Sequence, residues 1–352
     1  MNFPRLIPFQ RSETHVVVDI GSSSVKLATV NNGAGRQTIS ANMIVPLPPG
    51  SVWNGWIRDK TAVAGAIRGY IQGRRLHSAA AVTAVPGRAI MIKTLDLPSM
   101  DIVDLETTIE FQAMDLIPAN LNDVFLDFQV TRESKDKKRL SVLLTVAKKE
   151  LVHGYMEVLS EAGLVPRIID VDYFALENLC HRRQLNPNDE TVCVMHIGAS
   201  VTTLNITGNG APRRSTDLRT GGQTFTDRIA HTLGISCEEA ETLKVDNPLG
   251  SKPEGWTTLV PSLCEELAHE LKRAVNVFAT VNGNQRIDRL LVCGGGAKLA
   301  GVEARIFEEF HDCVESCAAW VGADESSADG SDELSPEFAV VRGLAMRAPW
   351  HP

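Results

Sequence analysis

The segment VVVDIGSSSVKLAT at residues 16–29 has a second copy, CVMHIGASVTTLNI, at residues 193–206. The shared positions include Ile20 with Ile197, Gly21 with Gly198, Ser23 with Ser200 and Leu27 with Leu204. Each copy is an apolar run, a Gly-Ser turn and an alternating run, which is the pattern of a β-hairpin. Because the copies lie about half a chain length apart, they predict two similar lobes.

The turns of these hairpins have the composition of a phosphate-binding site. Glycine lets the backbone approach a bound group closely, and serine hydroxyls with successive N–H groups suit phosphate oxygens. A third glycine element, Gly294-Gly295-Gly296, follows the apolar run that ends at Cys293. Three glycines in succession are typical of a place where no side chain fits, such as beside a base or a sugar. Together the three elements predict a nucleotide cleft.

Length and composition set the broad class. The chain has 352 residues, 43% of them hydrophobic, which favours two folded domains or lobes. A formal charge of −8 argues against a nucleic-acid partner, since phosphate contacts need a basic face. No apolar run is long enough to span a bilayer and the start lacks a secretory signal, so we expect a cytoplasmic protein. The seven cysteines form no CxxC pair, which indicates neither a disulfide framework nor a zinc site.

The region between the repeats predicts a helix at 60–73, a strand at 79–86 and then a separate α+β block. That block has a helix around residues 102–116, strands at 124–131 and 140–146, and a second helix at 149–161. We expect it to be an insert at 87–166. The first lobe then comprises 12–86 and 167–188, and the second comprises 189–230 and 286–352, with a subdomain at 231–285 that carries a long helix. The acidic residues 322–335 are expected to form a surface loop.

At this point the chain resembles the actin-like ATPase superfamily, and within it the PilM type of type IV pilus assembly protein. The resemblance runs over residues 14–348 and is most specific in LPSMDIVDLETTIEFQAMDLIPANLNDVFLDFQV (97–130) and TGGQTFTDRIAHTLGISCEEAETLK (220–244). It implies an α/β actin-like (RNase H-like) two-lobed fold. The first lobe would carry the α+β insert and the second a smaller helical and β subdomain, with ATP between the lobes.

The resemblance also implies roles for individual residues. The first phosphate loop, with contacts to the β- and γ-phosphates of ATP, would be Gly21, Ser22, Ser23, Ser24 and Lys26, with Asp19 facing Mg²⁺. The second phosphate loop would be Gly198, Ala199, Ser200 and Thr202. The ribose and adenine would be bordered by Gly221, Gly222, Gly294, Gly295 and Gly296, with Glu241 and Lys244 on the adenine side.

His196 departs from this pattern, because the family carries an aspartate before the second Ile-Gly pair. Replacing a carboxylate with imidazole removes a charge and a preferred oxygen ligand of Mg²⁺, whereas a protonated histidine could meet a phosphate. Three interpretations stay open: ATP binding with poor hydrolysis, weak ATPase activity supported by Asp19, or loss of nucleotide binding. No residue is an evident catalytic base. Asp170 and Asp172 could orient water, although carboxylates at strand ends more often cap the next helix.

The function implied by the resemblance is that of an ATP-binding adaptor or scaffold of a type IV pilus or related secretion platform. Its expected partner is the N-terminal cytoplasmic peptide of a PilN-like inner-membrane protein, docked in a groove between the first lobe and the insert. That contact would hold the chain at the inner face of the cytoplasmic membrane. Other platform proteins and further copies of the chain are also expected partners.

Other function classes compete with the adaptor. One is a weak ATPase or a small-molecule kinase, which needs a carboxylate base facing a second substrate, and no such signature is visible. Another is a structural scaffold that binds no nucleotide. A cell-division relative would need a terminal amphipathic helix, which RGLAMRAPWHP is not expected to provide.

Overall fold

The computed structural model describes residues 13–33, 36–117, 120–134, 136–182, 190–208, 214–246, 253–281, 286–310, 314–316 and 335–347. The predicted repeat is present in it as two sheets of the same topology. The first has the order β10-β6-β1-β2-β3 and the second β13-β12-β11-β14-β15. In each, three antiparallel strands are followed by two parallel ones. Both 193–206 and 16–29 therefore form the predicted hairpins at equivalent places.

The strands of the first sheet are β1 (Glu13–Ile20), β2 (Ser24–Gly33), β3 (Arg36–Pro46), β6 (Ala80–Val85) and β10 (Val165–Val171). Those of the second are β11 (Thr191–Ile197), β12 (Thr202–Gly208), β13 (Arg214–Leu218), β14 (Arg289–Cys293) and β15 (Val314–Ser316). A small ribbon of β4 (Val52–Trp53) and β5 (Trp56–Ile57) adjoins the first lobe. The centre of β1 is the apolar run Val16–Val18, which is fully buried because the strand is covered on both faces.

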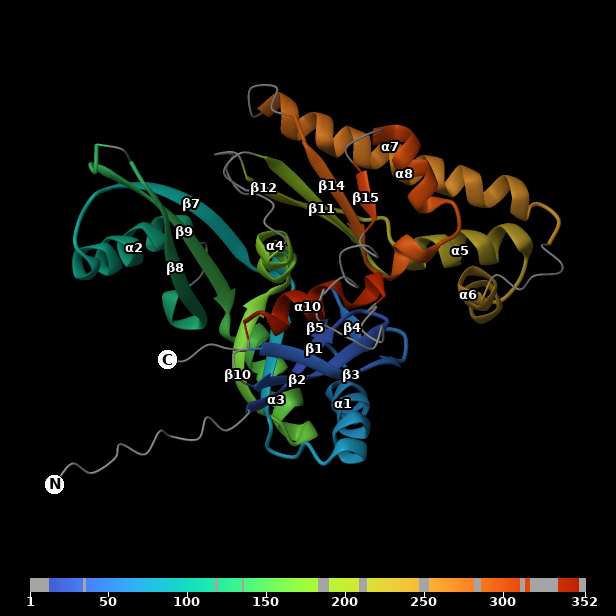
Figure 1. The fold of residues 1–352 in the computed structure, drawn as a ribbon, viewed down its shortest axis with the longest axis horizontal. Helices are drawn as coiled ribbons and strands as arrows, with labels where there is room; N and C mark the ends of the chain where they lie inside the picture. Colours follow the sequence, from blue (N-terminus) through green and yellow to red (C-terminus); the bar gives the residue numbers. More distant parts are fainter. Residues whose placement is uncertain are drawn as a thin grey trace.

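Two helices fill the space between the lobes. They are α4 (Asp172–Arg182) and α10 (Ala339–Ala345), which lie between the second sheet above and the first sheet below in Figure 1. One apolar core joins them to Val17 and Val82 of the first sheet and to Val194 and Leu291 of the second. The relative placement of the lobes therefore depends on this helix pair.

Helices also cover the outer faces of the sheets. The first lobe has α1 (Lys60–Arg74), whose N-terminus is capped when the Asp59 side chain accepts the Ala62 N–H. The second lobe has α5 (Gly222–Leu233), α6 (Cys237–Asp246), α7 (Trp256–Val281) and α8 (Val302–Phe310). The helix predicted at 60–73 and the long helix predicted within the subdomain at 231–285 are thus confirmed.

The insert is a three-stranded antiparallel sheet packed on a helix, and it projects from the first lobe in Figure 1. Its strands lie in the order β7 (Met91–Pro98), β9 (Arg139–Lys148) and β8 (Val124–Glu133), and α2 (Ile102–Leu116) covers one face. The sequence predicted β8, β9 and α2, but not β7. Short 3-10 turns, η1 (Gly87–Ala89) and η2 (Leu121–Asp123), lead into β7 and β8.

The expected insert of 87–166 is longer than this packed unit. Helix α3 (Lys149–Ala162) buries Leu151, Tyr155 and Leu159 in the core that it shares with α1, and β10 belongs to the first sheet. We therefore propose that the insert ends near Lys148 and that α3 belongs to the first lobe. The acidic segment at 322–335 lies, apart from Ser335, outside the described residues, as do Cys313 and Cys317.

Candidate functional site

The two predicted phosphate loops have the same turn geometry. In the first, the Gly21 N–H donates to the Ser24 carbonyl at 3.0 Å, and in the second the Gly198 N–H donates to the Val201 carbonyl at 2.9 Å. A Cβ at Gly21 would lie 3.1 Å from the Ser24 carbonyl oxygen, and one at Gly198 would lie 3.0 Å from that of Val201. Each turn therefore leaves little space for a side chain at its first position.

The loops face each other across the gap between the lobes. The Ser200 hydroxyl donates to the Ser22 hydroxyl at 2.7 Å, although the two residues belong to different lobes. The cavity that the loops line, here called the cleft, holds about 90 Å³. Ordinary ligand pockets hold roughly 300–1,000 Å³, so the cleft between the two loops is smaller than a typical ligand site.

Asp19 lies on the wall of the cleft, as predicted, but it is already paired. Its Oδ2 lies 3.4 Å from Nζ of Lys26, and both side chains are largely buried. Lys26 also reaches back over the first loop, since its Nζ would lie 2.9 Å from a Cβ at Gly21. The first loop thus has a cation in a position suited to an anionic ligand.

His196 occupies the position on β11 that corresponds to Asp19 on β1, and its side chain lines the cleft. Burial lowers the pKa of this imidazole to about 4, and Asp19 opposes that effect only in part. The histidine is therefore neutral at pH 7 in the ligand-free chain. A neutral imidazole supplies neither the carboxylate that Mg²⁺ prefers nor the positive charge considered for a phosphate contact.

The cleft contains further polar residues, and three of them, Tyr173, Thr203 and Asp217, were not predicted from the sequence. Asp217 accepts hydrogen bonds from the Tyr173 hydroxyl at 2.9 Å and the Thr203 hydroxyl at 2.7 Å. Asp172 accepts the Gly87 N–H at 2.7 Å, and burial raises the pKa of its carboxyl to about 7. Asp172 is one of the residues that line the cleft, and Asp170 is not. Tyr173 and Asp217 come from different lobes, so no local motif could have paired them.

Arg88 also lines the cleft, from the short turn η1. Its Nε and Nη1 atoms are buried and have no hydrogen-bond partner among the described residues. Lys26 and Arg88 together give the cleft two cations. These residues fit a phosphate-bearing ligand, because an unpaired buried guanidinium is stabilised by an anion.

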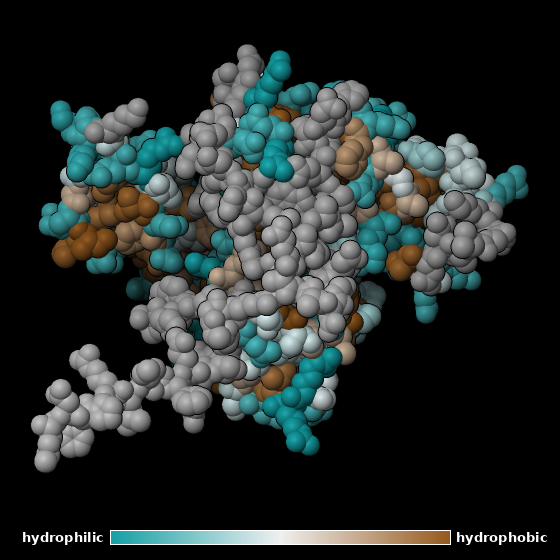
Figure 2. Space-filling view, viewed as in Figure 1, coloured by the Kyte–Doolittle hydropathy of each residue, from teal (hydrophilic) through white to brown (hydrophobic). Residues whose placement is uncertain are grey.

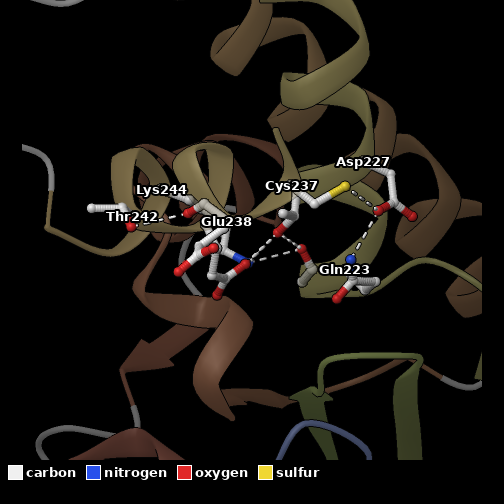
Figure 3. A network of polar contacts seen from close by, with 9 residues as sticks. Gln223, Asp227, Cys237, Glu238, Thr242 and Lys244 are labelled. Carbon is white, nitrogen blue, oxygen red and sulfur yellow. Dashed lines mark hydrogen bonds and ion pairs between the residues drawn. The ribbon is translucent and has the colours of Figure 1, made fainter. Parts of the chain in front are cut away.

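The predicted adenine-side residues gather at the start of α5. The Gly222 and Gln223 N–H groups donate to the Gly198 and Ala199 carbonyls at 2.9 and 2.7 Å. Lys244 on α6 donates to the Gly222 carbonyl at 3.0 Å and lies 2.6 Å from Glu241. Figure 3 shows another contact between these two helices, in which Cys237 on α6 lies against Asp227 on α5. A Cβ at Gly221 would lie 2.7 Å from the Ala199 carbonyl oxygen, so this glycine is required where α5 meets the second loop.

The glycine triplet packs against β11. Gly294 has φ +91°, and a Cβ there would lie 2.4 Å from the Ile197 carbonyl oxygen. A Cβ at Gly296 would lie 2.3 Å from the Ile197 side chain, whereas one at Gly295 would approach only Glu337 at 3.4 Å. Close packing between strand and turn η3 (Gly295–Lys298) is thus sufficient to explain two of the glycines. The role beside ribose or adenine stays a prediction.

A second cavity, here called the groove, lies between the first lobe and the insert and holds about 340 Å³. Its walls come from β8, β9, β10 and the start of α4, and its apolar lining includes Phe125, Phe128 and Phe174. At one side the Arg347 Nε donates to the buried Asp170 carboxylate at 2.7 Å. Asp170 and Asp172, two residues apart, therefore belong to different cavities.

A larger hollow of about 980 Å³ lies elsewhere, between β7, β13 and α7. It shares Asp217 with the cleft, but no residue of either phosphate loop lines it, so size alone does not identify the candidate site. Among the described residues, no three His, Cys, Asp or Glu side chains converge on a metal position.

Comparisons with known proteins agree with this geometry. The family model described as type IV pilus assembly protein PilM matches residues 17–349. A solved structure of a PilM-PilN type IV pilus biogenesis complex is 26% identical, with a TM-score of 0.79, and the match covers 96% of this chain and 99% of that one.

Two more distant structures share the fold alone. The ethanolamine utilization protein EutJ from Carboxydothermus hydrogenoformans is 16% identical, with a TM-score of 0.57 and coverage of 95% of this chain and 89% of that one. A diol dehydratase-reactivating factor in nucleotide-free form is 9% identical, with a TM-score of 0.56 and coverage of 96% and 99%. The predicted actin-like fold is confirmed.

Proposed function

Since the chain belongs to the PilM family of type IV pilus assembly proteins, we propose that it is an ATP-binding adaptor of a pilus assembly platform. In this proposal the groove binds the N-terminal cytoplasmic peptide of a PilN-like inner-membrane protein. The cleft binds ATP with Mg²⁺, and nucleotide acts by biasing lobe closure rather than through turnover. The observation that carries the proposal is the groove between insert and first lobe, in a chain similar to the PilM of a PilM-PilN complex.

The groove is suited to an extended peptide because two sheet edges meet there. Strand β8 is the end strand of the insert sheet and β10 is the end strand of the first sheet, and both line the groove. An edge strand offers unpaired backbone groups that an added strand can satisfy, while pockets beside it select side chains. Apolar side chains of the peptide would lie against Phe125 and Phe128, whereas Asp127 and Gln129 offer polar contacts.

The groove also has open space for side chains of such a peptide. Its volume of about 340 Å³ falls within the range of ordinary ligand sites, unlike that of the closed cleft. Phe125 is 42% exposed and is fixed from one side by an edge contact with His153. A large, positioned and exposed aromatic side chain is typical of the residues that dominate binding energy.

ATP binding is supported by the matched loops and by the two cations of the cleft, Lys26 and Arg88, of which Arg88 has no hydrogen-bond partner for its Nε and Nη1 atoms among the described residues. Bound ATP would supply a negatively charged partner for Arg88, and Asp19 would face the Mg²⁺ that accompanies the nucleotide. We propose that ATP hydrolysis is slow. Of the two equivalent positions before the glycine turns, Asp19 carries a carboxylate for Mg²⁺, whereas His196 carries a neutral imidazole.

The proposed location is the inner face of the cytoplasmic membrane, where the partner's tail would hold the chain. Within the described residues no helix is long and apolar enough to cross a membrane. Further contacts with other platform proteins or with copies of the chain belong to the same proposal. Figure 2 shows hydrophobic surface over α2, whose exposed side chains include Ile102, Phe111 and Met114.

The experiment that tests the proposal is a titration of the full chain with a synthetic peptide of the PilN-like N-terminal segment, followed by fluorescence anisotropy. Thr145 on β9 lines the groove, so Thr145→Trp fills it and should weaken binding by about tenfold or more, equivalent to about 1.4 kcal/mol. Ser141 lies on the same face of β9, outside the groove lining, so Ser141→Trp is the matched control and should change affinity by less than about twofold.

A second variant, Phe125→Ala, tests the same surface without adding bulk. It removes an exposed ring, so the fold should be retained while peptide affinity falls. Peptide binding that is unchanged in both Thr145→Trp and Phe125→Ala would show that the peptide docks elsewhere. No binding to the wild-type chain would refute the adaptor proposal itself.

A further inference from the structure

Arg88 is the charged group of the cleft that the structure leaves without a partner. Two of its three guanidinium nitrogens, Nε and Nη1, are buried and make no hydrogen bond to any described residue. Leaving a charged donor buried and unpaired costs more than a hydrogen bond returns, so such a group points to something the site binds. No motif marks this residue in the sequence, because it lies in η1 rather than in either phosphate loop.

The neighbouring acidic groups are already engaged by other donors. Asp19 pairs with Lys26, Asp172 accepts the Gly87 N–H, and Asp217 accepts the hydroxyls of Tyr173 and Thr203. Asp172 also carries only part of a charge at neutral pH, because burial raises its pKa to about 7. The described part of the cleft thus holds one cation, Lys26, that is neutralised by an ion pair and a second, Arg88, that is not.

The backbone around Arg88 is held firmly enough to present it. Gly87 directly precedes it, donates its N–H to Asp172, and lies so close to Tyr173 that a Cβ would be 2.3 Å from the ring. On the other side, the Ala89 and Ile90 N–H groups donate to Pro86 and Gly87 at 2.9 and 3.2 Å. A cation on a fixed turn is preorganised for its ligand.

We propose that Arg88 is a phosphate ligand of the cleft, a third anion-binding element beside the two glycine-serine loops. This inference rests on the proposed nucleotide binding and assigns a residue to it. When the lobes open to admit a nucleotide, the guanidinium donates charge-assisted hydrogen bonds to phosphate oxygens, which a lysine at this position could not do with the same planar geometry.

The test is calorimetric titration of the full chain with ATP and with inorganic tripolyphosphate, using wild type, Arg88→Gln, Arg88→Lys and Arg68→Gln. Arg88→Gln should lower the affinity for both ligands by about tenfold or more, because charge-assisted hydrogen bonds are lost. The affinity of Arg88→Lys for both ligands should lie between the affinities of Arg88→Gln and wild type. Arg68, which donates to the Glu161 carbonyl on the outside of the first lobe, is the matched control and should leave affinity unchanged.

Ligand-free stability separates this role from a structural one. Because Arg88 has unpaired buried nitrogens, Arg88→Gln should unfold at the same temperature as wild type or higher. Unchanged ATP and tripolyphosphate affinities in Arg88→Gln, or a stability loss without an affinity loss, would overturn the inference. If the wild-type chain binds neither ligand, the proposed nucleotide binding fails, and this inference fails with it.

Discussion

Substituting alanine for Gly343 should force helices α4 and α10 apart and destabilise the junction of the lobes. An ideal Cβ at Gly343 would lie 1.8 Å from the Ala175 carbonyl oxygen and 2.4 Å from its carbonyl carbon. Both residues are buried, and both atoms belong to helix backbone that cannot rotate away. The helices would have to separate by more than an ångström within the core that joins the two sheets.

The size of the effect follows from two opposing contributions. Overpacking a buried site costs roughly 1–3 kcal/mol, and a backbone clash belongs at the upper end of that range. Alanine in a helix is favoured over glycine by about 1 kcal/mol. The net loss should therefore be about 2 kcal/mol, which for a chain of 352 residues corresponds to a fall of about 3 °C in the thermal midpoint.

The assay is thermal and urea unfolding of Gly343→Ala beside Gly69→Ala. Gly69 lies on the exposed side of α1, and a Cβ there meets nothing within 4 Å, so the same substitution should stabilise by about 0.5–1 kcal/mol. We expect the free energy of unfolding to fall in Gly343→Ala and to rise in Gly69→Ala. A Gly343→Ala protein as stable as Gly69→Ala would refute the close packing of α4 on α10.

Two further predictions concern the titratable groups of the cleft. His196→Asp should place a second carboxylate near Asp19, so the thermal midpoint of the metal-free protein should fall. Mg²⁺ with ATP should stabilise this variant more than wild type, by about 1.4 kcal/mol for each tenfold gain in affinity. A thermal shift with Mg²⁺ and ATP equal to that of wild type in scanning fluorimetry would contradict this prediction. For Asp172, the folded chain keeps a proton up to about pH 7 that the unfolded chain loses near pH 4, so stability should fall as pH rises through that window, by at most about 4 kcal/mol. Asp172→Asn should remove this slope, and parallel stability profiles of the two proteins from pH 4 to 8 would count against it.

The parts of the fold that depend on local pattern could be predicted from the sequence. The hairpins of β1–β2 and β11–β12 have a clear alternation and a glycine turn, and the helices α1 and α7 have an apolar face at helical spacing. Strand β7 was missed because only Leu95 and Leu97 of its side chains are buried, which gives a weak signal. Its pairing with β9 comes from tertiary structure rather than from its own pattern.

Assignments that depend on packing between distant segments were harder. The apolar face of α3 was visible, but the sequence does not say that it packs on α1 rather than on the insert. The glycine triplet was interpreted as space for a ligand, whereas Gly294 and Gly296 lie against Ile197. Arg88 and Asp217 carry no motif, and they enter the cleft only because η1 and β13 are brought to it by the fold.

The groove is the feature on which the proposed function depends, and hydrogen exchange tests it most directly. The full chain would be exchanged with and without a saturating PilN-like N-terminal peptide. We predict slower exchange in β8 (Val124–Glu133), whose outer edge the peptide would cover, and at the Phe174 end of the groove. Exchange in β8 that is unchanged by a bound peptide, with protection on another surface, would contradict the account.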